Sequence, residues 1–108
     1  MKQRSDSRKN GPDRSRERAA AEALAIQALE FLAAEPERLG RFLALSGIGP
    51  EALRAAAHEP NFLAGVLEHV TGYEPLLIEF AEHVRIKPPS VMRAAAALGA
   101  VPWERDVP

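Results

Sequence analysis

Five prolines divide the chain at intervals of 10 to 15 residues, and each one precedes apolar residues at helical spacing. They are Pro36, Pro50, Pro60, Pro75 and Pro88. Proline is tolerated in the first turn of a helix because the N–H that it lacks would have no partner there, and its fixed φ suits a helix start. The prolines therefore predict a series of short helices joined by tight turns.

The residues between the prolines supply the apolar faces of these helices. After Pro60, apolar side chains follow the i, i+3, i+4, i+7 template at Leu63, Val66, Leu67 and Val70. The segment after Pro75 repeats the pattern and contains Phe80, while a longer first helix is expected from Asp13 or Ser15 to about Glu35. The other expected faces are Ala25, Ala28, Leu29 and Leu32; Leu39, Phe42 and Leu43; Leu53, Ala56 and Ala57; and Val91, Ala94, Ala95 and Leu98.

No segment alternates with the period of two that marks a strand, and glycines follow several of the expected helices. Gly47, Gly72 and Gly99 stand where three of the helices should end, and Gly47 is placed to be the left-handed residue after its helix. We therefore predict an all-α, compact bundle of about six short helices, which forms a single helical domain over residues 19–100.

Composition limits the classes of protein to which the chain can belong. Its 108 residues suggest one domain, and the absence of cysteine rules out disulfides and thiolate metal sites. No apolar run approaches the roughly 20 residues of a membrane span. We expect a soluble cytoplasmic protein without a membrane contact.

The net charge of -1 hides an uneven distribution. Residues 1–18 hold seven Lys and Arg against three Asp and Glu, which gives +4, and the rest of the chain holds seven against twelve, which gives -5. Residues 1–12 also have almost no large apolar side chain, so burial cannot offset their ordering entropy. We expect residues 1–18 to form a disordered basic tail and residues 101–108 to form a C-terminal extension.

Two stretches carry a family resemblance. They are Glu35-Pro36-Glu37-Arg38-Leu39-Gly40-Arg41-Phe42-Leu43-Ala44-Leu45-Ser46-Gly47 and Glu59-Pro60-Asn61-Phe62-Leu63-Ala64-Gly65-Val66-Leu67. With Glu74-Pro75 and Phe80-Ala81-Glu82, the chain resembles the bacterial family known as domain of unknown function 3572 over roughly residues 22–98. The resemblance implies a small all-helical protein, and it brings no activity, cofactor or catalytic residue.

The turn Gly47-Ile48-Gly49 is the sharpest local signal for a ligand. A helix, a Gly-hydrophobe-Gly turn and a second helix are similar to the helix-hairpin-helix motif, whose backbone N–H groups contact a nucleic-acid phosphate. The chain departs from that motif at Glu51, which would repel a phosphate, and at Leu53, where a small residue is typical. The alternative is a tight interhelical turn with Gly47 as the C-cap and Ile48 packed on the core.

The basic tail and the only tryptophan are the other candidate contacts. The tail could bind a polyanion, although it lacks an aromatic residue for base stacking and an apolar stripe for a membrane. Trp103 could cover the end of the bundle or anchor a partner, since tryptophan is enriched in interface hot spots. The candidate polyanion residues are Lys2, Arg4, Arg8, Lys9, Arg14, Arg16 and Arg18.

No residue pattern points to catalysis or to a metal. The three histidines, His58, His69 and His83, form no His-x-x-x-His or Glu-x-x-His pair within a helix. Ser46 and Ser90 stand at helix boundaries, where capping explains them. We therefore expect no enzyme, no catalytic residue, no metal and no cofactor.

Two functional hypotheses remain. The first is a non-catalytic helical interaction or accessory protein that holds an unidentified protein partner in a helical groove. The alternative is a nucleic-acid-associated protein that uses the basic tail and the glycine turn. Salt would separate them, because phosphate contacts weaken steeply as salt rises.

Overall fold

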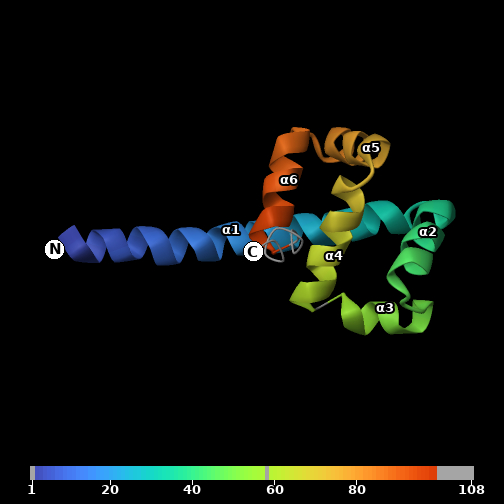
Figure 1. Ribbon diagram of the computed structural model, residues 1–108, viewed down its shortest axis with the longest axis horizontal. Coiled ribbons are helices and arrows are strands. Elements are labelled where there is room, and N and C mark those ends of the chain that lie inside the picture. The colour runs from blue at the N-terminus through green and yellow to red at the C-terminus, as the bar shows by residue number, and fades with distance from the viewer. Residues whose placement is uncertain (1, 58, 100–108) are drawn as a thin grey trace, which may run out of the picture.

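The computed structural model describes the backbone of residues 2–57 and 59–99, and the side chains of residues 15–57 and 59–99. Within these residues the fold is all-α and contains no strand, as the sequence predicts (Figure 1). The six helices are α1 (Lys2–Ala33), α2 (Pro36–Ser46), α3 (Pro50–Ala56), α4 (Pro60–Thr71), α5 (Glu74–Val84) and α6 (Pro88–Ala97).

The prolines stand at the helix starts. Each helix from α2 to α6 has a proline in its first turn, preceded by a residue with extended backbone. Gly47 ends α2 with φ 77°, and its N–H donates to the Leu43 carbonyl at 2.9 Å. Gly99 follows α6 with φ 82°. The predicted starts of α2 to α6 and the left-handed Gly47 are therefore confirmed, whereas Gly72, which ends α4, has φ -81°.

The end of α5 departs from the glycine pattern. Arg85 has φ 63°, a conformation that costs a residue with a Cβ roughly 1–2 kcal/mol. The Ile86 N–H donates to the Ala81 carbonyl at 3.0 Å, and the Ile86 side chain packs against the core. These two contacts offset the cost of the left-handed turn, so the position accepts an arginine.

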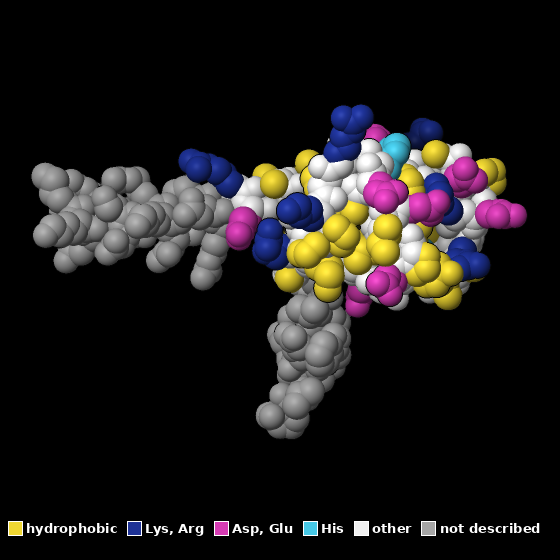
Figure 2. All heavy atoms as spheres, turned by 90° about the horizontal axis from the view of Figure 1, so that it is seen from above, with side chains coloured by type: hydrophobic (Ala, Val, Ile, Leu, Met, Phe, Trp, Pro, Cys, Tyr) yellow, Lys and Arg dark blue, Asp and Glu magenta, His cyan; other side chains and the backbone are white. Residues whose placement is uncertain are grey.

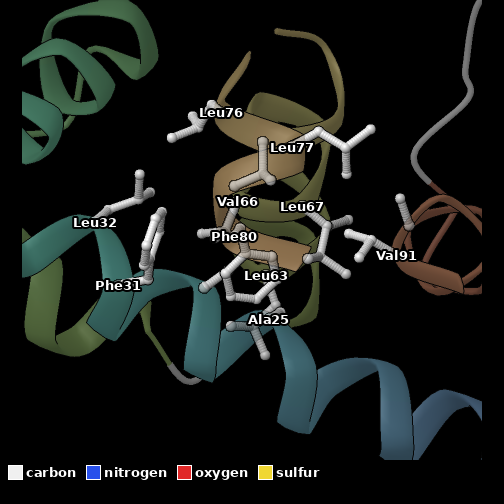
Figure 3. Close-up of a cluster of buried hydrophobic side chains, with 14 of the residues drawn as sticks. Ala25, Phe31, Leu32, Leu63, Val66, Leu67, Leu76, Leu77, Phe80 and Val91 are labelled. Carbon is white, nitrogen blue, oxygen red and sulfur yellow. The ribbon is translucent and has the colours of Figure 1, made fainter. Parts of the chain in front are cut away.

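The core lies where α1, α4, α5 and α6 meet. Figure 3 shows Phe31 and Leu32 of α1 directed toward side chains of α4 and α5, with Val91 entering from α6. Phe80 is fully buried, and its ring centroid lies 5.4 Å from that of Phe31. All four predicted α4 positions are buried, as are Ala25, Ala28, Leu32, Leu77, Phe80, Ala81, Val91, Ala95 and Leu98. Leu29, Val84 and Ala94 are only partly buried.

The first helix begins earlier than predicted. Its backbone is helical from Lys2, so a start at Asp13 or Ser15 is wrong for the structure. Ala21 is the first buried residue, and the described side chains before it, residues 15–20, are exposed. The segment therefore extends α1 without packing on the core, and the disorder expected for residues 1–18 stays a prediction.

Residues 36–57, which we call the α2–α3 arm, are packed much less tightly than the core formed by α1, α4, α5 and α6. Phe42 is the only buried residue of α2, and α3 has no buried residue. The predicted side of α3, with Leu53, is the less exposed side of the helix, but its residues are only half-buried, as are Leu39 and Leu43 of α2. Figure 1 shows the arm leaving the end of α1 and returning to the start of α4, so α3 lies at the edge of the bundle.

Candidate functional site

An open groove lies between α2 and the region where α4 gives way to α5. We call it the α2–α4 groove. Its larger lobe has a volume of about 600 Å³ and lies between Arg41 and Leu45 on one wall and His69, Tyr73 and Leu76 on the other. A second lobe of about 410 Å³ shares Leu45 and His69 with the first and reaches toward the start of α4. The two lobes therefore form one continuous surface.

The apolar side chains of the groove are unusually accessible. Leu45 is 72% exposed and Tyr73 is 51% exposed. Beneath them Phe42 is 3% exposed, and its ring meets those of Phe62 and His69 edge-on at centroid distances of 5.7 and 5.1 Å. A partner that covered Leu45 would gain roughly 1.5–3 kcal/mol from a side chain of this size.

Polar contacts join α2 to the opposite wall. The Arg38 guanidinium lies 3.0 Å from a Glu79 carboxylate oxygen and 4.3 Å above the Phe31 ring centroid. The Arg41 guanidinium lies 5.9 Å from the Tyr73 ring centroid. Because these side chains belong to α2, α5, α1 and the α4–α5 turn, they hold the arm against the bundle.

His69 forms part of the groove floor. Burial, and secondarily the positive charge of Arg41, lower the pKa of His69 below its ordinary value of 6.5. Both causes favour the neutral form of the ring. A neutral ring can pack against Phe42 without placing a second cation beside Arg41.

The glycine turn Gly47-Ile48-Gly49 is surrounded by contacts with its own neighbouring residues. The Gly47 N–H donates to Leu43 O at 2.9 Å, and the Ile48 N–H is directed at Ser46 Oγ at 3.4 Å. The Glu51 carboxylate folds over Gly49, with Oε2 3.2 Å from where a Gly49 Cβ would lie. An anion at the start of α3 would meet this carboxylate, so the geometry favours an interhelical turn with Gly47 as the C-cap. Ile48 is half-buried and lines the smaller lobe.

Most of the remaining candidate residues have side chains outside the described residues. Arg16 and Arg18 are exposed on α1. The side chains of the other candidate tail residues and Trp103 lie outside the described residues, as does His58. Among the described side chains, no cluster of three His, Cys, Asp or Glu could hold a metal. None of the described helices is long and apolar enough to cross a membrane.

Exposed apolar residues also occur away from the groove. Figure 2 shows apolar side chains gathered over the face where α5 and α6 lie, with acidic and basic side chains around them. Ile78 on α5 is 43% exposed, Met92 on α6 is 53% exposed and Ile26 on α1 is 44% exposed. None of these three lines the α2–α4 groove.

Comparison with known proteins places the chain in a family. The model of a family described as protein of unknown function (DUF3572) matches residues 18–100, which is most of the chain. The chain belongs to the DUF3572 family. Comparisons with curated proteins and with solved structures give no match.

The DUF3572 match separates the candidate sites. The α2–α4 groove and the glycine turn lie within it. Six of the seven candidate tail residues and Trp103 lie outside it. The sequence missed the groove, although Leu45 and Tyr73 offered one signal: each is a large apolar residue next to a predicted turn and outside the apolar stripe.

Proposed function

We propose that this DUF3572 protein is a non-catalytic helical interaction protein of the cytoplasm, which holds a protein partner in the α2–α4 groove. The exposure of Leu45 above an apolar floor is the observation that carries the proposal. A leucine that is 72% exposed adds little to folding, whereas a partner that covers it gains apolar contact. Tyr73, on the opposite wall, offers a ring and a hydroxyl, a combination that is frequent in interfaces.

The chemistry of the groove supports binding rather than catalysis. Its charged residues include the Arg38–Glu79 pair, which is a structural contact between helices. The lowered pKa of His69 has burial and Arg41 as its causes, and the ring packs against Phe42. These packing roles account for Arg38, Glu79 and His69 without a reaction.

A matched pair of substitutions tests the proposal. Leu45→Asp places a charge in the groove, and Ile26→Asp does the same at an exposed apolar residue outside it. Tagged wild-type protein and both variants are used to recover partners from the native host, with nuclease and high salt. A protein recovered by the wild type and Ile26→Asp, but not by Leu45→Asp, supports the proposal. Equal recovery by all three proteins, or recovery only without nuclease, contradicts it.

The basic N-terminal segment favours a second candidate, which is association with nucleic acid. Arg16 and Arg18 are exposed on the part of α1 that does not pack on the core. If the basic tail binds nucleic acid, the affinity for nucleic acid should fall steeply as salt rises, and it should be lost when residues 1–18 are removed. If the truncated protein binds as tightly as the full chain, the tail version fails. Glu51→Gln, which removes the charge beside Gly49, should raise the affinity if the glycine turn contacts a phosphate.

A further inference from the structure

We infer that the partner of the α2–α4 groove is a basic amphipathic helix, with an apolar ridge flanked by Lys or Arg. This inference rests on the proposed function and names the chemistry of its partner. It follows from the charges that the groove leaves uncompensated, and from where they lie relative to its apolar floor.

The carboxylates of the groove outnumber its cations. The larger lobe is lined by the acidic residues Glu37, Glu68 and Glu79 and by the basic residues Arg38 and Arg41. The smaller lobe shares Glu68 and adds no Lys or Arg. The surface that a partner meets is therefore acidic overall.

The cations of the groove are also directed toward the protein's own side chains. Arg38 pairs with Glu79 at 3.0 Å and covers the Phe31 ring, and Arg41 faces the Tyr73 ring. Among the described residues, Arg38–Glu79 is the only salt bridge, so Glu37, Glu68 and Arg41 have no ion-pair partner, and the unpaired groups carry two negative charges against one positive charge. The side chains of Glu37 and Glu68 are exposed.

The two unpaired carboxylates stand on opposite walls. Glu37 belongs to the first turn of α2 and Glu68 to α4, with Leu45, Phe42 and His69 on the surface between the two helices. A helix lying along this surface would place apolar residues at i, i+3, i+4 and i+7 on the floor. Its flanking positions would face the carboxylates, so Lys or Arg there would complement the groove.

Synthetic helices test the charge preference directly. Two labelled peptides share a leucine ridge at i, i+3, i+4 and i+7, and carry either Lys or Glu at the flanking positions. Their binding to the full chain is measured by fluorescence anisotropy. We expect the Lys peptide to bind about tenfold or more tightly than the Glu peptide at low salt.

Two double variants with the same change in net charge show whether the preference for the Lys peptide depends on the carboxylates of the groove. Glu37→Lys/Glu68→Lys reverses both unpaired groove carboxylates, and Glu30→Lys/Glu82→Lys reverses two exposed carboxylates that do not line the groove. The first double variant should abolish or invert the preference for the Lys peptide. The second should retain most of it, because it changes only the long-range field.

The outcomes separate this inference from the proposed function. If both peptides bind equally and Leu45→Asp weakens both, the groove binds a helix and the basic partner is wrong. If neither peptide binds the wild type, the inference fails, and the recovery of partners by the Leu45→Asp and Ile26→Asp variants still decides the proposed function. If Leu45→Asp binds the peptides as tightly as the wild type, both proposals fail. Preferential binding of the Glu peptide, or an equal effect of the two double variants, overturns the inference. Concentration-dependent self-association that Leu45→Asp abolishes, with no peptide binding, would replace the basic helix with a second copy of the chain.

Discussion

Helices α4 and α3 begin in the same way and end up in opposite environments. Each opens with a proline followed by apolar residues at helical spacing. Five residues of α4 are buried and it packs on α1, α5 and α6, whereas α3 has no buried residue. A proline and a helical period therefore identify a helix, but whether its face is buried depends on which other helices pack against it.

Side-chain volume explains part of this difference. The buried face of α4 contains Leu63, Val66 and Leu67, whereas the corresponding face of α3 has one leucine and two alanines. Alanine buries little area, so a seven-residue helix with this face gains little from packing. The α2–α4 groove forms where this loosely packed arm meets the well-packed bundle.

The largest expected contrast is between a leucine of α4 and a leucine of α3. Leu67 is fully buried, so Leu67→Ala should lower the free energy of unfolding by about 2–5 kcal/mol. Leu53 is half-buried, so Leu53→Ala should cost less than about 1 kcal/mol. Urea denaturation followed by circular dichroism measures both, and similar losses would show that α3 is part of the core.

Two glycines of the arm provide the next contrast. Gly47 has φ 77°, so Gly47→Ala should destabilise the protein by about 1–2 kcal/mol. Gly40 lies inside α2, and a Cβ there would meet no atom within 4 Å. Gly40→Ala should therefore stabilise the protein by about 0.5–1 kcal/mol. Thermal unfolding of both variants checks the signs, and stabilisation by Gly47→Ala would contradict the left-handed turn.

The pKa of His69 predicts how stability depends on pH. Because burial and Arg41 lower this pKa in the folded state, the unfolded chain binds the proton at a higher pH. The stability that His69 contributes is present above its ordinary pKa of 6.5 and is lost as the pH falls below it. Melting temperature is measured between about pH 7.5 and about pH 5.5 for the wild type and for His69→Gln. The wild type should lose more stability than His69→Gln as the pH falls. Parallel pH profiles of the two proteins would show that the His69 ring does not contribute this pH dependence.

The smallest expected effect is that of the ion pair between the arm and the bundle. Arg38 and Glu79 have side chains that are 25% and 58% exposed, so solvent screens their attraction. Glu79→Gln should cost less than about 1 kcal/mol, and high salt should reduce the difference from the wild type. Chemical denaturation at low and high salt measures it. A loss of several kcal/mol would show that the arm depends on this contact rather than on Phe42.

The sequence predicted the elements far better than their surroundings. The starts of five helices and the left-handed Gly47 follow from local chemistry, because proline and glycine restrict or permit particular φ values whatever surrounds them. The α4 face was also predictable, since four large apolar residues on one side of a helix require a partner. The sequence did not reveal the start of α1 at Lys2 or the left-handed Arg85, both of which depart from local preferences.

Only the tertiary structure decided where the α2–α4 groove, the candidate functional surface, lies. Leu45 and Leu67 are both leucines in helices that begin with proline, yet one is 72% exposed and the other is fully buried. The apolar stripe separates Leu67 from Leu45 in the sequence, but the groove around Leu45 depends on side chains brought close from distant parts of the chain. The sequence by itself determined six helices, an acidic domain and a basic N-terminal segment. The packing of α1, α4, α5 and α6 left α2 and α3 at the edge of the bundle, and so placed Leu45 and two unpaired carboxylates around one groove.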